Sequence, residues 1–345
     1  MDDGSHIRPA CARTGPARWA HYRGAVSTPA PAASSDAPPT ARPSDGPADR
    51  LARFRGWTRG VLVANVISQV AIIVTGGAVR LTGSGLGCST WPMCEPGQFT
   101  PVFHEAASYH PFVEFGNRTM TGVLAVIAVA VLLLVRTDRT RSSGYRWLGV
   151  VPLLGVAAQA GIGGVVVLLD LHPGWVSLHF GVSAALVWLS AYLLHRHGEG
   201  DSPPRPVASP AVGAVGTVLG LLVVPVVMLG VIVTGAGPHS GDTQVGYRLA
   251  VDPLLMTRAH SASVWLFVGV LALLIVLLLR QPGSAPVRRA RRGAWLLLAV
   301  TLAQGAVGYA QYFTGLPALL VGLHMLGASL LVWATATTVL RLRTR

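Results

Sequence analysis

The run SVWLFVGVLALLIVLLL at residues 263–279 contains no charged side chain and is followed at once by Arg280. Its length approaches the roughly 20 apolar residues that a helix needs to cross a bilayer. In lipid, every backbone N–H and C=O group needs a partner inside the segment, so such a run must be helical. The run therefore predicts a membrane-spanning helix, which we place at 256–279.

Seven further stretches have the same apolar character and a similar length. Working outward from 256–279, the sequence predicts spanning helices at 57–79, 112–135, 146–169, 175–195, 211–234, 294–313 and 317–340. The predicted fold class is an all-α membrane protein with eight transmembrane helices.

The composition agrees with a membrane protein. Hydrophobic residues make up 51% of the chain and charged residues 12%, against about 25% charged residues in an ordinary soluble domain. The net charge of +13 would suggest nucleic-acid binding in a soluble protein. Here the arginines stand in short blocks between apolar runs, so we expect a lipid bilayer and no nucleic acid as the partner. Residues 1–50 are rich in Pro, Ala, Ser and Arg, and we expect them to form a disordered cytoplasmic tail.

The placement of arginine predicts the orientation in the membrane. Arginine blocks precede the first span, separate the second from the third and the sixth from the seventh, and follow the eighth. The opposite side has only Arg80 and Arg248. Because cytoplasmic loops carry the excess of basic residues, both termini are expected on the cytoplasmic side of a bacterial-type plasma membrane. The loops at about 80–111 and 235–255 are then expected outside.

The second half of the chain repeats the first. QAGIG at 159–163 resembles QGAVG at 304–308, and SLH at 177–179 resembles GLH at 322–324, both at an offset of 145 residues. VTGG at 74–77 likewise resembles VTGA at 233–236. Three similarities in the same order indicate a duplication. We therefore expect two pseudo-symmetric four-helix bundles, at 57–195 and 211–340.

Away from the cytoplasmic ends of the predicted spans, charged residues and histidines lie only on the even-numbered spans. Ionisable groups in lipid cost a few kcal/mol or more each and usually have a function. All of them fall in the first turns of their spans, so we expect one layer near the outer face. The layer comprises Glu114, Asn117, Arg118, His179, Arg258, His260 and His324.

His260 and His324 lie at similar depth on two helices of the predicted C-terminal bundle. Two imidazoles that face each other across a four-helix bundle are suited to be the axial ligands of a heme iron. The alternative is that each histidine is hydrogen-bonded to a separate backbone carbonyl group. The duplication favours the heme interpretation, because it makes the two residues a matched pair.

The N-terminal bundle keeps His179 but has Asn117 where a second ligand would be expected. Asparagine is a poor iron ligand, so this half is predicted to hold a heme by one histidine and to leave one face open for chemistry. The alternative is that Asn117 only packs through hydrogen bonds. Glu114 shares a helix face with Asn117 and is a candidate base or charge stabiliser. Its alternative role is an ion pair with Arg118 or Arg80.

The loop after the first span contains Cys88 and Cys94 among Gly and Pro residues. By the expected orientation they lie on the oxidising side of the membrane, which favours a disulfide. Binding of a soft metal is the alternative. Arginines near the outer layer, Arg118 among them, are candidates to pair with heme propionates, or to reach lipid phosphates instead.

Together these segments resemble the heme A synthase family. The resemblance covers about residues 57–340 and rests on GGAVRLT at 76–82 running into the cysteine loop, EFGNR at 114–118, and the two units that run from Gln159 to His179 and from Gln304 to His324. Each segment is weakly specific alone, but their order, spacing and membrane placement together are specific.

The resemblance implies an oxidoreductase that converts a methyl group of heme O to the formyl group of heme A by successive hydroxylations. It implies a heme b cofactor held by His260 and His324, and substrate bound near His179, Asn117 and Arg118. Glu114 matches the essential carboxylate of the family, and Cys88 and Cys94 match its loop cysteines. Heme O synthase and assembly factors of the terminal oxidase are the partners it implies. Asn117 departs from the family, many of whose members have histidine there.

Other functions remain open from the sequence. A diheme cytochrome that exchanges electrons with quinone would need a ligand pair in each half, which Asn117 disfavours. A transporter would be expected to have broken helices at the bilayer midplane, whereas the polar residues here lie near one face. The prenyl transferase that makes heme O needs paired Asp-rich segments, and the chain has none.

Overall fold

A computed structural model of the protein describes residues 51–102, 108–239, 241–242 and 244–345. Within these ranges eight helical segments are long and apolar enough to cross a membrane, which confirms the predicted fold class. The tail predicted at 1–50 lies outside the described residues. A short 3-10 helix, η1 (Arg55–Trp57), precedes the first long helix.

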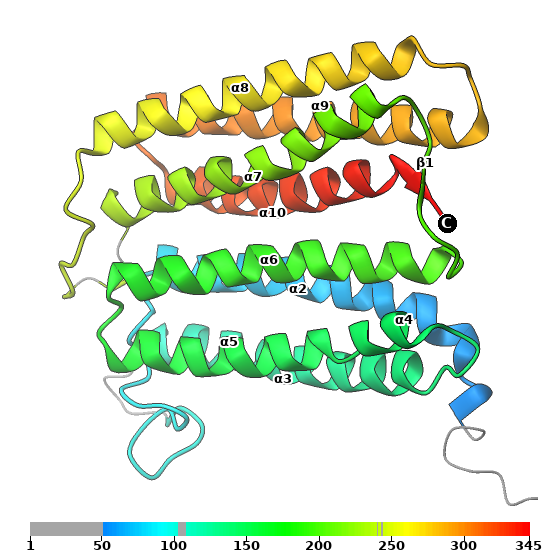
Figure 1. Ribbon diagram of the computed structural model, residues 1–345. Helices are drawn as coiled ribbons and strands as arrows, with labels where there is room; N and C mark the ends of the chain where they lie inside the picture. The colour runs from blue at the N-terminus through cyan, green and yellow to red at the C-terminus, as the bar shows by residue number, and fades with distance from the viewer. Residues whose placement is uncertain (1–50, 103–107, 240, 243) are drawn as a thin grey trace, which may run out of the picture. The chain divides into compact units, whose positions relative to one another are not determined.

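The spanning segments follow one another along the chain and alternate in direction (Figure 1). They are α2 (Thr58–Leu81), α3 (His110–Arg136), α4 (Ser143–Leu148) with α5 (Val151–Leu168), α6 (Pro173–Gly198), α7 (Pro210–Ala236), α8 (Pro253–Leu279), α9 (Ala285–Phe313) and α10 (Ala318–Leu340).

Proline and capping side chains mark where several helices begin. Proline occupies the first turn of α3 and of α5 through α9, where its missing N–H group costs no hydrogen bond. Asp252 accepts hydrogen bonds from Leu254 and Leu255 at the start of α8, and Ser284 accepts one from Val287 at the start of α9.

Two predicted boundaries differ from the structure. The span predicted at 146–169 is interrupted, because α4 ends at Leu148 and α5 begins at Val151 with Pro152 in its first turn. The span predicted from 294 begins at Ala285, so its arginine block is helical. Arginine is a good helix former, and the Ser284 cap sets the true start.

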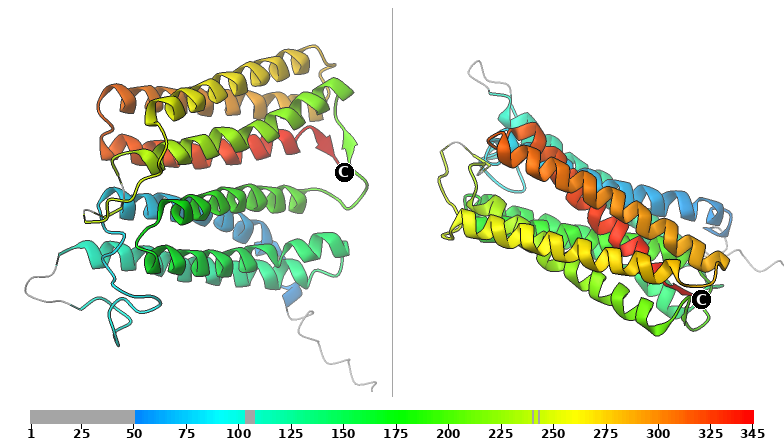
Figure 2. Two further views of the ribbon diagram at one scale, coloured as in Figure 1. Left: turned by 60° about the vertical axis from the view of Figure 1, so that its left-hand side comes forward. Right: turned by 90° about the horizontal axis from the view of Figure 1, so that it is seen from above.

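The helices pack in two neighbouring sets. In the first set α2 packs against α3 and α6, and α5 packs against α3 and α6. In the second set α7 packs against α8, and α9 against α10. Helix α10 also contacts α2 and α6, and α7 contacts α6, which joins the sets (Figures 1 and 2). The pseudo-symmetry of two bundles stays a prediction.

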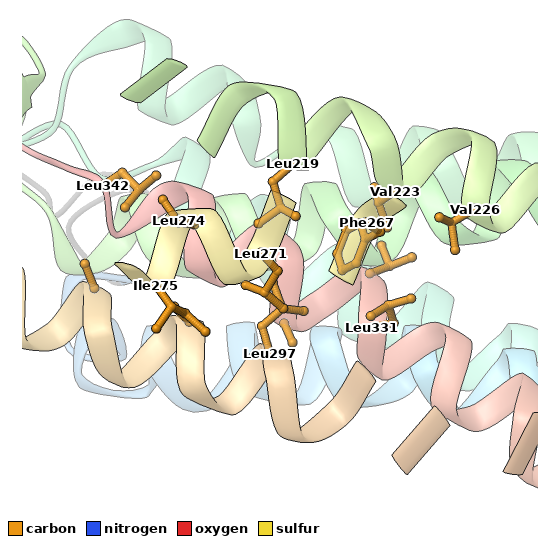
Figure 3. Packing of buried hydrophobic residues seen from close by; sticks show 14 of the residues in the cluster. Leu219, Val223, Val226, Phe267, Leu271, Leu274, Ile275, Leu297, Leu331 and Leu342 are labelled. Carbon is orange, nitrogen blue, oxygen red and sulfur yellow. The ribbon is translucent and has the colours of Figure 1, made fainter. Parts of the chain in front are cut away.

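The largest apolar core lies among α7, α8, α9 and α10 and reaches α6. Leu219 and Val223 of α7 lie near Phe267 and Leu271 of α8, as Figure 3 shows, and Leu297 of α9 joins them. Leu219, Leu271 and Leu297 are completely buried. Burying an aliphatic or aromatic side chain of this size contributes about 1.5–3 kcal/mol in water. Inside a bilayer the surrounding lipid is itself apolar, so close van der Waals packing between helices replaces much of this hydrophobic contribution.

The two ends of the helices differ in chemistry. We call the end with the loop 82–102 the disulfide end, because Cys88 and Cys94 lie there. We call the other the arginine end, since it carries the arginine-rich connections 137–142, 199–209 and 280–284 and the final residues 341–345. At the arginine end β1 (Arg205–Pro206) pairs antiparallel with β2 (Arg343–Thr344).

Candidate functional site

Four candidate residues occupy matching positions near the starts of their helices. Asn117 lies seven residues after His110, the first residue of α3, and His260 lies seven residues after Pro253, the first residue of α8. His179 and His324 each lie six residues after the first residue of α6 and α10. These helices all begin at the disulfide end, so the four residues lie at comparable depth there.

His260 and His324 face each other. Their ring centroids are 6.5 Å apart and their planes are nearly perpendicular, at 80°. An imidazole nitrogen binds a metal at about 2 Å and lies roughly 1 Å from its own ring centroid, so two rings on opposite sides of one iron have centroids about 6 Å apart. The observed spacing therefore fits a heme iron between the two rings.

Each of these rings lies against a glycine on a neighbouring helix. A Cβ atom built on Gly230 of α7 would lie 3.1 Å from Cε1 of His260, and one on Gly308 of α9 would lie 3.1 Å from Cε1 of His324. Each ring also lies near a backbone group of that neighbouring helix, four residues before the glycine: Val226 of α7 for His260 and Gln304 of α9 for His324. A metal-binding histidine typically turns one nitrogen to such a group and the other to the metal.

His179 has a closely similar environment in the first set of helices. A Cβ atom on Gly163 of α5 would lie 3.4 Å from Cε1 of His179. Gln159 donates a hydrogen bond of 3.0 Å to the His179 carbonyl, as Gln304 donates one of 2.8 Å to the His324 carbonyl. Nδ1 of His179 is buried without a hydrogen-bond partner among the described residues, which leaves it available to a ligand.

Asn117 is held by a side chain of α2. Thr75 donates a hydrogen bond of 2.7 Å to Oδ1 of Asn117. This contact fits the alternative in which Asn117 packs through hydrogen bonds. With its oxygen engaged, the Asn117 amide is still less suited to bind iron, so His179 is the candidate ligand in this set.

Glu114 is buried and fully engaged by hydrogen-bond donors. Its Oε2 accepts from the Cys88 backbone N–H at 2.7 Å, and its Oε1 accepts from Nε and Nη2 of Arg118 at 3.1 and 2.5 Å. An ion pair with Arg118 is the alternative role that the sequence left open for Glu114, beside that of a base or charge stabiliser. The side chain is 4% exposed, so this charge pair is shielded from solvent, and its electrostatic effect is correspondingly strong.

Arg118 connects this carboxylate to the loop 82–102. Its guanidinium donates to the carbonyl groups of Thr90, Pro92 and Met93. Cys88 and Cys94 are joined by a disulfide, as predicted. The ring of Trp91 lies against Gly164 of α5, where a Cβ atom would come within 2.7 Å of it. The loop is therefore fixed next to the glycine that follows Gly163.

The remaining arginines of the predicted layer have other contacts. Arg80 donates to the Thr234 carbonyl of α7 at 3.1 Å, and Arg248 donates to the Pro238 carbonyl at 2.8 Å. Arg248 also donates to the Tyr247 carbonyl, so hydrogen bonds occupy one nitrogen of the Arg80 guanidinium and two of the Arg248 guanidinium and leave the others for an acidic ligand. Arg258 is exposed on α8.

Sequence reasoning missed the residues that support the candidate ligands. Thr75, Trp91 and the three glycines next to histidine rings were not proposed as site residues. The sequence does contain a signal for the glycines. In each repeated unit a glycine lies four residues after the glutamine: Gly163 after Gln159, and Gly308 after Gln304. That spacing places the two residues on one helix face.

The described residues contain no group of three or more His, Cys, Asp or Glu side chains that could hold a metal ion by themselves. A heme iron receives four ligands from the porphyrin and needs only one or two from the protein. A facing pair in one set and a single histidine in the other thus suit heme better than a bare metal ion.

These features define a polytopic membrane protein with a facing pair of histidines and a third histidine at matching depth at one end of its helices. A family model described as cytochrome oxidase assembly protein matches residues 59–239. Because the match covers more than half of the chain, the protein belongs to this family.

Similar curated proteins have a more specific name. The chain is 30% identical over 144 residues to the heme A synthase of Symbiobacterium thermophilum, covering 41% of this chain and 45% of that protein. It is 33% identical over 133 residues to the heme A synthase of Geobacillus kaustophilus, covering 36% and 40%. The chain thus spans less than half of the length of these two relatives.

Proposed function

We propose that this protein is a heme A synthase, which oxidises a methyl group of heme O to the formyl group of heme A for maturation of a terminal oxidase. The observation that carries the proposal is the facing pair His260 and His324, together with a single histidine, His179, at the matching position of the other set of helices. A closed two-ligand site suits a resident cofactor, whereas a one-ligand site leaves a face for a substrate. The names of the similar proteins support the same activity.

In this proposal His260 and His324 hold a heme b. When bound, that group supplies one-electron redox chemistry. Gly230 and Gly308 leave room for the imidazoles, and the hydrogen bond from Gln304 to the His324 carbonyl fixes the start of α10 against α9. These residues orient the rings before the group binds, so little side-chain entropy is lost on binding.

Heme O is proposed to bind in the first set of helices near His179, Asn117 and Arg118. Glu114 then acts by its charge. Both of its oxygens accept hydrogen bonds from N–H donors, which favour the charged form of the carboxylate. A fixed buried carboxylate of this kind stabilises positive charge that develops on a substrate. Arg118 positions the carboxylate and the loop 82–102 together.

In each proposed hydroxylation the methyl carbon gains the oxygen atom of one water molecule, and two electrons and two protons are released, the electrons to an external electron acceptor. The first hydroxylation gives an alcohol and the second a gem-diol, which loses water to leave the formyl group. The pairing of a substrate site with a separate redox site agrees with this need to remove electrons. We also propose that heme O synthase delivers the substrate and that oxidase assembly factors receive the product.

The test of the activity is the identity of the extracted pigment. The protein is purified from cells that make heme O, and its hemes are extracted with acid and identified. Heme B together with heme O or heme A is expected. Glu114→Gln should lower the ratio of heme A to heme O about 100-fold, the usual scale for one electrostatic group at an active site. Glu95→Gln, which changes an acidic residue of the loop 82–102, should leave the ratio unchanged.

Other outcomes would assign a different function. Heme B alone would favour a diheme or monoheme electron carrier. A protein without heme would exclude both the heme A synthase and the electron carrier. Equal heme A content in wild type and Glu114→Gln would contradict the role of the carboxylate while leaving the activity in place.

We propose that the disulfide end lies outside the cell and that both termini are cytoplasmic, from the distribution of arginine. A green fluorescent protein fused after Arg345 should fluoresce, and alkaline phosphatase fused within 244–252 should be active. The reverse pattern would overturn this orientation.

A further inference from the structure

Several arginines at the arginine end of α8, α9 and α10 already have a protein partner. Arg291 donates to the carbonyl groups of Leu278, Leu279 and Gln281 at the end of α8. Arg288 donates to the Gly283 carbonyl, and Arg345 pairs with Glu199 and donates to the Ser202 carbonyl. The guanidinium of Arg343 lies over the ring of Tyr192.

Arg289 and Arg341 form a neighbouring pair without such partners. Within the part of the chain that the structure describes, neither guanidinium makes a hydrogen bond or ion pair, and Arg341 has Arg289 and His195 as electrostatic neighbours. Nη1 of Arg341 lies 3.3 Å from the position of a Cβ atom on Gly293, one turn after Arg289 on α9. The absence of a side chain at Gly293 thus lets Arg341 lie across α9 towards Arg289.

Among the described residues, no acidic side chain pairs with Arg289 or Arg341. The sequence has no Asp or Glu after Asp252. At the arginine end, Glu199 and Asp201 are engaged by Arg141, Arg196 and Arg345. Burial and the charge of Arg289 both lower the pKa of Arg341. Two like charges held this close, one of them half-buried, cost free energy that an anion between them would offset.

The position of the pair in the membrane indicates the kind of anion. Arg289 lies in the second turn of α9, and Arg341 caps the end of α10, so both lie at the ends of spanning segments. Leu296 lies seven residues after Arg289, on the same helix face, and is 41% exposed, next to the half-exposed Trp295. A phosphate at the arginines would therefore have an apolar helix surface directly beneath it.

We propose that Arg289 and Arg341 form a binding site for the phosphate of an anionic phospholipid, whose acyl chains lie along Leu296 and Trp295 of α9. Guanidinium groups suit this ligand because each presents a planar pair of donors to phosphate oxygens. The site is separate from the proposed heme sites, which lie at the opposite end of the helices, and it does not depend on the proposed activity.

The test compares lipid binding to the full-length protein and to matched variants. Protein purified in neutral detergent is titrated with dimyristoyl phosphatidylglycerol, dimyristoyl phosphatidylcholine or inorganic phosphate, and bound lipid is counted by native mass spectrometry. Phosphatidylglycerol is expected to bind at least about tenfold more tightly than phosphatidylcholine, since each arginine near a membrane surface contributes about 1 kcal/mol. Inorganic phosphate at the same concentration is not expected to displace it.

The variants locate the site. R289Q and R341Q should each weaken phosphatidylglycerol binding several-fold, and R341K should retain most of it. R280Q removes an equal charge from an exposed arginine at the same end and should bind like wild type. Circular dichroism and a single elution peak verify that each variant is folded.

Two results would overturn the proposal. Equal affinity for phosphatidylglycerol in wild type and in the R289Q/R341Q double variant would show that the lipid binds elsewhere. Displacement by inorganic phosphate at equal concentration would assign the pair to a soluble anion instead of a lipid.

Discussion

A glycine beside each candidate histidine shows how one residue sets the geometry of a proposed heme ligand. Gly163, Gly230 and Gly308 each lie within 3.4 Å of an imidazole carbon, measured from the Cβ atom that a larger residue would have. At 3.1 Å, for Gly230 and Gly308, even alanine would press on the ring. These glycines allow neighbouring helices to approach closely, as small residues do in membrane bundles.

Gly308→Val should therefore reduce binding of the proposed heme b. The branched side chain has to displace the His324 ring, which moves one of the two proposed ligands off its axis. We expect at least a tenfold loss of heme B per protein, measured in pyridine extracts, because ligand displacements of this kind cost more than 1.4 kcal/mol.

Gly305→Val is the matched control on the same helix, since nothing lies within 4 Å of its Cβ position. It should keep the wild-type heme content. Equal content in the Gly308 and Gly305 variants would argue that His324 is not a ligand.

At the scale of elements, α3 and the loop 82–102 form one unit. Helix α3 supplies Glu114 and Arg118, which bind the backbone of Cys88 and three loop carbonyl groups. Ser84 of the loop also hydrogen-bonds Nδ1 of His110 at the start of α3, at 2.8 Å. The disulfide closes the loop on itself, but these bonds attach it to the helix.

Arg118→Met should release the loop without unfolding the helices. Methionine keeps much of the apolar volume but loses the donors to the loop, each worth about 1 kcal/mol. Chymotrypsin cleavage within 82–102 should become about tenfold faster or more, because local opening exposes the chain to the protease.

Arg258→Met serves as the control, since Arg258 is an exposed arginine near the start of α8. In this variant chymotrypsin should cleave the loop 82–102 at the wild-type rate. Unchanged cleavage in Arg118→Met would mean that the hydrogen bonds from Arg118 do not hold the loop in place.

At the scale of the whole molecule, the connection between α6 and α7 links the two sets of helices at the arginine end. Asp201 of this connection accepts hydrogen bonds from Arg141 at 2.9 Å and from the Ser142 backbone at 2.8 Å. Strand β1 pairs with β2 at the end of the chain. Residues from three distant parts of the sequence thus meet at this connection.

The Arg141 guanidinium holds the pKa of Asp201 well below its usual range. The contribution of Asp201 to stability should therefore be complete above about pH 4, the ordinary aspartate value, and be lost as the pH falls through its lower folded-state pKa. Relative to wild type, Asp201→Asn should lower the free energy of unfolding by about 1 kcal/mol at pH 7. This difference should shrink in acid, as measured by thermal unfolding between pH 7 and pH 3.

Asp170→Asn changes an exposed aspartate at the other end of the helices and should show no such pH-dependent difference. A difference between wild type and Asp201→Asn that grows in acid would contradict the assigned direction.

The sequence by itself determined the fold class, because an uncharged apolar run such as 263–279 has no stable form in lipid except a helix. It also selected the polar residues of the candidate site, since His179, His260 and His324 stand out inside apolar spans. Its errors fall at the break before Pro152 and at the start of α9. There a local cap or a proline, and not hydropathy, decides the boundary.

Only the tertiary structure decided which side chains meet. Periodicity places Glu114 and Asn117 on one face of α3, but it does not show that Glu114 is occupied by Cys88 and Arg118, or that Thr75 holds Asn117. Nor does it show Arg341 lying across α9 at Gly293. The physical reason is that hydropathy reports whether a segment enters the membrane, whereas contacts between helices depend on small residues and on how each helix is rotated against its neighbours.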